Sequence, residues 1–168
     1  PTSSMGRLFD AVASLVGVRQ VASYEAQAAI ELEALLPSGP HSPLSVPEVS
    51  PYLVELGQQD GVIVCDPRPL LRRLAADVLA GRPRPALAGA FHAALVQLIV
   101  QLSLTLRAET GINYVGLSGG VFQNVTLLAS ADAALRRHNF HVLIHRYAPP
   151  NDGGIALGQA AIAAAQMH

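Results

Sequence analysis

Cysteine and tryptophan are almost missing from this sequence. Its 168 residues include one cysteine, Cys65, and no tryptophan. A single cysteine excludes an internal disulfide framework and suits a reducing compartment, so we expect a cytoplasmic protein. Because Cys65 ends a short apolar run, residues 62–64, we interpret it as a buried structural thiol rather than as a nucleophile.

Strong net charge and long uninterrupted apolar runs are also lacking. The formal charge is −1 at pH 7, which provides no general surface for a polyanion and argues against nucleic acid as a main partner. No signal peptide is recognisable, and no membrane association is expected. The most apolar run, residues 91–106, falls short of a membrane span and predicts a buried core helix. Polar residues interrupt it at Gln97, Gln101, Ser103 and Thr105.

What the sequence does contain is typical of a helix-rich α/β protein with one domain. Half of its residues are apolar, and the length suits a single core. Residues 37–51 are rich in proline and predict an irregular connection with a short edge strand near 44–46, and we expect an irregular insertion over about 37–60. Hydrophobic periodicity predicts helices at about 8–16, 25–36, 66–80 and 85–110, a hairpin with strands at 52–56 and 61–65, and then strand 113–117, helix 120–137, strand 140–144 and helix 153–166.

Two glycine-containing junctions are the most informative local patterns. The strand 113–117 leads directly into Ser118-Gly119-Gly120 and a helix, and residues 148–154 (APPNDGG) form a proline-stiffened loop before another helix. Glycine lets the backbone approach a ligand closely, and free N–H groups at a helix start favour an anion. Since both junctions follow strands of a predicted parallel sheet, we expect them to share one nucleotide cleft. Tight packing of a helix on a strand is the alternative explanation for the glycines.

Single polar residues near these junctions have two interpretations each. Asn124 is expected about one turn into its helix, where it either contacts a base or ribose or is an exposed helix position. Asp10 is either a ligand contact or a solvated helix acid. Asp152 lies on the rigid loop as a candidate metal ligand, or it is an ordinary turn former. The six histidines form no ligand cluster, because His141 and His145 would lie roughly 13 Å apart on a strand.

Four segments together resemble one known family. Residues 5–12 (MGRLFDAV), 23–33 (SYEAQAAIELE), 117–124 (LSGGVFQN) and 149–158 (PPNDGGIALG) resemble the C-terminal region of the HypF family of carbamoyltransferases. They are more distantly similar to the universal tRNA threonylcarbamoyl-transfer family. The resemblance covers nearly the whole chain. It implies that residues 1–168 form the second lobe of an actin-like, sugar-kinase-like (ribonuclease H-like) ATPase fold, with the first lobe absent from this chain.

The resemblance also implies roles for particular residues. It assigns nucleotide binding to Asp10, Glu31, Gly119, Gly120 and Asn124. It makes Asp152 a ligand of a divalent metal, zinc or iron, together with two histidines that lie upstream of this chain. Residue 26 departs from the pattern, because Ala26 replaces the usual glycine and its methyl group puts close approach to a ligand in doubt.

The function implied by the resemblance is carbamoyl transfer. The group would pass from carbamoyl-adenylate, made with ATP, to the C-terminal cysteine of HypE, for synthesis of the cyanide ligands of [NiFe]-hydrogenases. The implied partners are therefore HypE and the N-terminal part of the same protein. The nucleophile belongs to HypE, so no catalytic residue is expected here and the isolated chain is expected to be inactive. The alternatives are a non-catalytic nucleotide-binding or docking lobe and an O-carbamoyltransferase acting on a small molecule.

Overall fold

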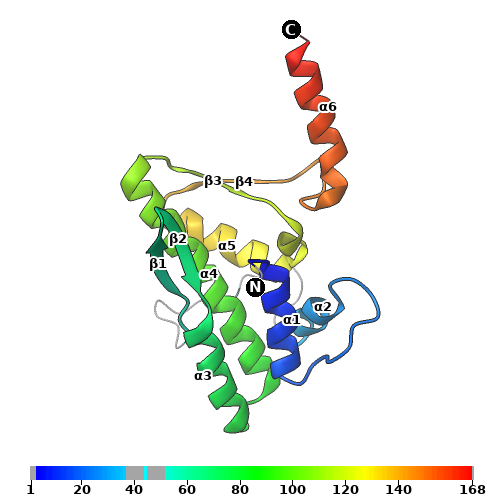
Figure 1. The fold of residues 1–168 in the computed structure, drawn as a ribbon, viewed down its shortest axis with the longest axis vertical. Coiled ribbons are helices and arrows are strands. Elements are labelled where there is room, and N and C mark those ends of the chain that lie inside the picture. The colour runs from blue at the N-terminus through cyan, green and yellow to red at the C-terminus, as the bar shows by residue number, and fades with distance from the viewer. Residues whose placement is uncertain (1–2, 37–43, 45–51, 168) are drawn as a thin grey trace.

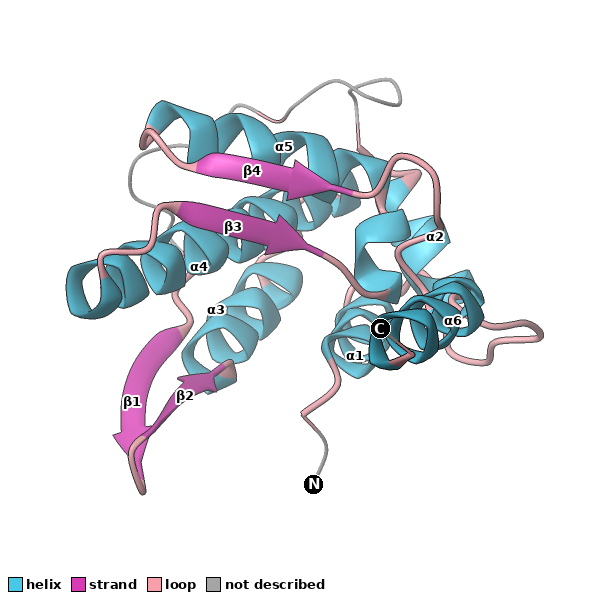
Figure 2. Ribbon diagram, turned by 90° about the horizontal axis from the view of Figure 1, so that it is seen from above, coloured by secondary structure: helices cyan, strands magenta, loops and turns pink. Residues whose placement is uncertain are grey.

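The computed structural model describes residues 3–36, 44 and 52–167. Figure 1 shows a body of packed helices from which the C-terminal helix projects, and Figure 2 shows the two parallel strands lying side by side over the helices of the body. The elements are α1 (Met5–Leu15), α2 (Gln27–Glu33), β1 (Glu55–Gln59), β2 (Val62–Asp66), α3 (Arg68–Leu79), α4 (Arg84–Thr110), β3 (Tyr114–Leu117), the 3-10 turn η1 (Gly120–Gln123), α5 (Val125–Arg137), β4 (His141–Ile144), the 3-10 turn η2 (Asp152–Gly154) and α6 (Ile155–Gln166).

Helix α4 is the centre of the core. It has 27 residues, and Gly111 ends it in the left-handed conformation (φ 72°) with its N–H bonded to the Arg107 carbonyl at 2.8 Å. By length and composition α4 is long and apolar enough to cross a membrane, so the expectation that this run falls short of a membrane span was wrong. However, 56% of its most apolar window is buried inside the fold, which confirms the prediction of a core helix.

Strands β3 and β4 pair in parallel, as predicted. Tyr114 lies opposite His141, and the register continues to Leu117 opposite Ile144. Helix α5 connects the two strands and packs on α4. Both strands therefore end on the same side of the sheet, which positions the loops that follow them close together.

The hairpin β1–β2 was predicted correctly, but its turn lies later than expected. Asp60 and Gly61 both have positive φ (52° and 77°) and form a two-residue turn between Gln59 and Val62. The strand expected at 52–56 therefore begins at Glu55. Tyr52 lies in the core instead, where its hydroxyl donates a hydrogen bond to Asp77.

Helices α1 and α2 pack against each other. Helix α1 buries Phe9, Val12 and Ala13, as its periodicity indicated. Helix α2 begins at Gln27 rather than near residue 25, because Ala26 has a left-handed backbone (φ 61°). The irregular connection and edge strand expected near 44–46 lie outside the described residues, apart from Leu44, whose N–H donates to Ser130 Oγ.

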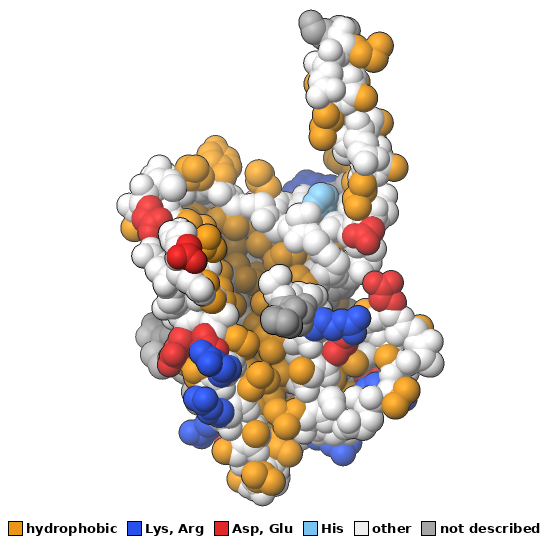
Figure 3. All heavy atoms as spheres, in the orientation of Figure 1, with side chains coloured by type: hydrophobic (Ala, Val, Ile, Leu, Met, Phe, Trp, Pro, Cys, Tyr) orange, Lys and Arg blue, Asp and Glu red, His pale blue; other side chains and the backbone are white. Residues whose placement is uncertain are grey.

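Helix α6 differs from the others because it has no buried residue. It extends away from the body, and Figure 3 shows hydrophobic side chains along it. Its position and the prediction of a helix at 153–166 agree, except that Asp152–Gly154 form a 3-10 turn before it.

Candidate functional site

The loops after β3 and β4 meet at one end of the sheet. The Gly119 N–H donates a 2.7 Å hydrogen bond to the Pro150 carbonyl, and His145 Nε2 lies 2.9 Å from Ser118 Oγ. The prediction that the two glycine-containing junctions lie together is therefore confirmed. An open hollow of about 230 Å³ adjoins them, lined by Gly116, Leu117, Ser118, Leu143, Ile144 and His145.

The glycines of these loops have different structural reasons. Gly119 has a φ of 103°, which other residues rarely adopt, and a Cβ on Gly154 would lie 2.7 Å from the Pro149 carbonyl oxygen. Gly120 has neither constraint. A Cβ there would meet Asn151 Cβ at 3.9 Å, an ordinary van der Waals contact. The fold alone therefore does not require glycine at position 120.

Asn124 lies elsewhere than the sequence predicted. It is the extended N-cap of α5 rather than a residue one turn into the helix, because η1 ends at Gln123. Its side-chain Oδ1 accepts a 2.7 Å hydrogen bond from the Leu127 N–H, which is the usual capping contact. Its Nδ2 lies 2.9 Å from His92 Nε2. Both polar atoms of this buried side chain thus have partners within the protein, and a contact to a nucleotide stays a prediction.

A side chain of α2 also accepts a hydrogen bond from the start of α5. The Thr126 N–H donates to Glu33 Oε1 at 2.9 Å. With the Leu127 N–H bound by Asn124, two of the first amides of α5 already have acceptors within the protein and do not serve an anion there. The expectation of an anion at the helix start concerned Gly119-Gly120 and stays a prediction. Close approach at Gly119-Gly120 remains as the feature suited to a ligand.

His92 is a central residue that the sequence singled out only as one of six histidines forming no ligand cluster. It is completely buried on α4, and its ring makes edge-to-face contacts with Phe9 and Phe91 at centroid distances of 5.4 and 5.7 Å. Its Nδ1 lies 2.8 Å from the Ala88 carbonyl, so Nδ1 carries the proton and Nε2 accepts from Asn124. Burial lowers the pKa of His92 and keeps the ring neutral.

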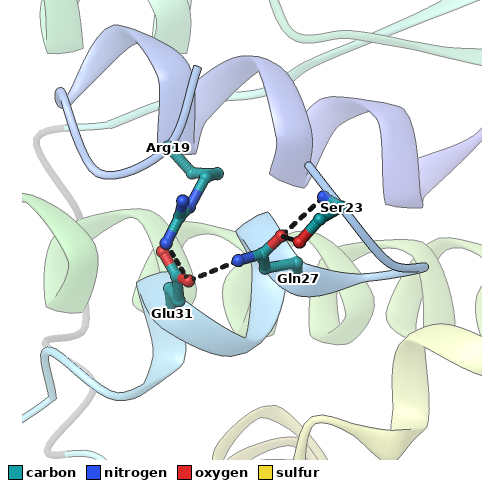
Figure 4. A network of polar contacts seen from close by, with 4 residues as sticks. All are labelled: Arg19, Ser23, Gln27 and Glu31. Carbon is teal, nitrogen blue, oxygen red and sulfur yellow. Dashed lines mark hydrogen bonds and ion pairs between the residues drawn. The ribbon is translucent and has the colours of Figure 1, made fainter. Parts of the chain in front are cut away.

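Glu31 is held in a polar network on α2. The Arg19 guanidinium donates to both of its carboxylate oxygens, with Nε at 2.8 Å from Oε2, and Gln27 donates to Oε1 at 2.9 Å. Gln27 is oriented in turn by the backbone N–H and hydroxyl of Ser23 (Figure 4). The hydrogen bonds from Arg19, followed by those from Gln27, lower the pKa of Glu31. Glu31 is therefore an ionised, oriented carboxylate, and its predicted contact with a ribose is untested.

Asp10 lies on α1, next to the buried Phe9, and forms an ion pair with Arg7 at 3.1 Å. Its side chain is 38% exposed. Helix α1 contacts both α2 and η1. Asp10, Glu31 and the loop of residues 118–120 after β3, here called the glycine loop, therefore lie on neighbouring elements. The structure brings these elements into one region without joining the two carboxylates directly.

Asp152 is exposed at the first position of η2, and the adjacent Asn151 Oδ1 accepts from the Gly153 N–H at 3.1 Å. Within residues 3–36, 44 and 52–167, no three His, Cys, Asp or Glu side chains are arranged to hold a metal ion. His141 stacks on Tyr114, and His145 pairs with Ser118. Asp152 can thus contribute one metal ligand, and the described residues do not complete a site around it.

Comparisons with known proteins agree on one family. Residues 1–159 match the model of the second subdomain of the carbamoyltransferase Kae1-like domain (HypF_C_2). The chain is 40% identical over 161 residues to carbamoyltransferase HypF from Synechocystis, covering 94% of the chain and 19% of that protein. Carbamoyltransferase HypF from Rhizobium leguminosarum is also 40% identical, over 96% of the chain and 20% of its own length.

Two solved structures share the fold. A full-length HypF in the phosphate- and nucleotide-bound form matches with a TM-score of 0.84 and 42% identity, over 96% of this chain and 20% of that one. HypF from T. kodakarensis matches with a TM-score of 0.66 at 22% identity, over 94% of this chain and 19% of its own, which shows the fold alone. The chain spans about a fifth of the length of these proteins. It therefore belongs to the HypF family, as the second subdomain of the Kae1-like carbamoyltransferase domain.

Proposed function

We propose that this chain is the nucleotide-binding second lobe of a carbamoyltransferase longer than the 168 residues, with an actin-like arrangement of two lobes. The reaction would move a carbamoyl group from carbamoyl-adenylate to the C-terminal cysteine of a HypE-type partner, for cyanide-ligand synthesis in [NiFe]-hydrogenase maturation. Family membership supports the transfer chemistry. The 42% identical full-length HypF was crystallised in a phosphate- and nucleotide-bound form, which is consistent with a nucleotide-binding function in this family.

Gly120 is the observation that carries the proposal. The fold tolerates a Cβ at this position, yet glycine occupies it at the point where the loops after β3 and β4 meet. A bare backbone there is explained by a ligand that needs to approach the chain closely. In the complete enzyme, this backbone would bind and orient the adenylate, and Asp10 and Glu31 on the neighbouring helices would lie on the ribose side.

The chain's one thiol is consistent with a nucleophile supplied by a partner. Burial raises the pKa of Cys65, so less of the reactive thiolate forms at neutral pH. Cys65 also lies in the β1–β2 hairpin rather than at the glycine loops. The proposal therefore assigns the cysteine that accepts the carbamoyl group to the partner protein.

A metal is proposed only in part from these residues. A divalent ion would polarise the carbamoyl oxygen as a Lewis acid, and the exposed carboxylate of Asp152 could provide one oxygen ligand. Since no three-ligand group exists among the described residues, the remaining ligands would come from elsewhere in the enzyme. The described residues of this chain would supply nucleotide contacts and one candidate metal ligand.

A pair of glycine variants in the full-length protein tests the nucleotide assignment. Gly120→Val should raise the dissociation constant for ATP in calorimetry at least tenfold while the melting temperature stays near that of the wild type. Gly89→Ala on α4 is a control for adding a side chain away from the glycine loop, because its new Cβ also meets one atom at 3.9 Å, Leu36 Cδ2. Equal ATP affinity in the wild type and Gly120→Val would remove the glycine loop from the binding site.

A further inference from the structure

The segment between the glycine loop and α5 is hydrogen-bonded to the central helix α4 through the side chain of Asn124. The Asn124 backbone N–H closes η1 on the Val121 carbonyl at 3.2 Å, and the Asn124 side chain caps α5 through Leu127. Its remaining polar group, Nδ2, bonds His92 Nε2. The conformation of the segment that follows Gly120 thus depends on an acceptor supplied by α4.

Only a neutral histidine ring completes this chain of hydrogen bonds as it stands. Nδ1–H donates to Ala88, which leaves Nε2 with its lone pair directed at Asn124 Nδ2. The surrounding Phe9 and Phe91 rings limit rotation of the imidazole. Without the His92 Nε2 acceptor, the buried Asn124 Nδ2 would lack this partner. A flip of the Asn124 amide group would break the capping hydrogen bond from the Leu127 N–H.

The hydrophobic core does not by itself explain a histidine here. The buried neighbours on α4 are apolar, as with Phe91, Ala94 and Leu95, and a Phe or Leu side chain would fill comparable space without needing two hydrogen bonds. A buried polar residue with both nitrogens satisfied specifies one arrangement of its partners. For His92 that partner is Asn124, the N-cap of α5.

We infer that His92 is a positioning residue for the nucleotide, acting through Asn124 to hold the segment 119–124 in its binding conformation. The inference rests on the proposed function, because it assigns a support to the same site. His92 itself touches no ligand. Its contribution is to keep the backbone at Gly119-Gly120 arranged before the nucleotide arrives, which lowers the cost of binding.

The test compares variants of the full-length protein with ATP as the probe, using calorimetry for affinity and thermal unfolding for stability. His92→Phe and His92→Met both remove the hydrogen-bond acceptor and fill the space with an apolar side chain. Both variants are made so that at least one of them unfolds cooperatively. His92→Gln retains an acceptor within reach of Asn124. Leu74→Ala on α3 is the stability control, because α3 packs mainly on α4 and α1 and its buried leucine leaves a cavity when truncated.

The inference predicts a separation of affinity from stability. His92→Phe or His92→Met should weaken ATP binding at least tenfold, whereas His92→Gln and Leu74→Ala should stay within threefold of the wild type, even where Leu74→Ala has the lower melting temperature. Hydrogen exchange of a peptide covering 116–128 should rise in the apolar variants and not in Leu74→Ala.

Two experimental outcomes lead to different conclusions. ATP affinity that follows melting temperature across all four variants would overturn the positioning role and leave the site intact. A wild type that binds no ATP, or that binds it equally well after Gly120→Val, would overturn the proposed function and the inference with it.

Discussion

The buried His92 makes the stability of this protein depend on pH in a direction that can be derived. Burial holds the pKa of His92 below its ordinary value of 6.5, although the Ala88 carbonyl and the charge of Glu33 act the other way. In the unfolded chain the imidazole takes up a proton near pH 6.5, whereas the folded protein resists it. The unfolded state therefore binds more protons as pH falls, and the free energy of unfolding decreases from pH 7.5 downward.

The size of the effect follows from the same difference. Lowering the pH from 7.5 to 5.5 stabilises the unfolded state by at most about 1.4 kcal/mol through this one residue, the limit being reached when the folded ring takes up no proton over the interval. For a chain of this length that corresponds to a drop in melting temperature of about 3–5 °C. Protonation would also place two N–H donors, those of His92 and Asn124, against each other.

Urea unfolding of the wild type and His92→Gln at pH 7.5, 6.5 and 5.5 measures this contribution. The glutamine variant has a lower starting stability but should lose less over the interval, by up to about 1.4 kcal/mol. The other five histidines are common to both proteins, so their contributions cancel in the difference. Parallel loss of stability in the two proteins would refute the reasoning, because it would mean that folded His92 takes up its proton normally.

Three further predictions concern single residues. Ala26→Gly should stabilise the protein by about 0.5–1 kcal/mol in urea unfolding, since glycine adopts the left-handed backbone at φ 61° without strain, and an unchanged or lower value would contradict this account of α2. Tyr52→Phe should lower the free energy of unfolding by about 1.5–3 kcal/mol, because the hydrogen bond to the Asp77 carboxylate is lost. Burial and then Asp77 raise the pKa of Tyr52 to about 12, whereas the unfolded tyrosine ionises near pH 10, so the wild type but not the variant should lose additional stability between pH 10 and 12. Asp152→Asn in the full-length enzyme should abolish carbamoyl transfer with a near-normal melting temperature, whereas an active variant would show that Asp152 is only a turn former.

The parts of the fold that local patterns encode were predictable. Alternating strands and helices after residue 113 indicated the parallel pair and the meeting of its two loops, and Gly111 marked the end of α4. The Asp60-Gly61 turn carried a clear signal, because this dipeptide favours a two-residue hairpin, and it should have placed β1 three residues later than predicted.

The supports of the candidate site were not predictable in the same way. His92 bonds a residue 32 positions away, and Glu33 bonds one 93 positions away, so neither partner is visible in a local pattern. Asn124 was placed inside a helix because helical periodicity does not distinguish a 3-10 turn followed by a new cap from one continuous helix. Asparagine is a favoured N-cap, and a histidine within the apolar stretch 86–96 indicates a buried polar contact, so both residues offered a signal.

A crystal structure of the full-length protein with an adenine nucleotide tests the central claim most directly. The account predicts that nucleotide atoms lie within van der Waals contact, about 4 Å, of the Gly120 backbone, between the loops that follow β3 and β4. It also predicts that the hydrogen bond between Asn124 and His92 is retained in the complex. A nucleotide bound elsewhere, with the Gly119-Gly120 loop open to solvent, would contradict it.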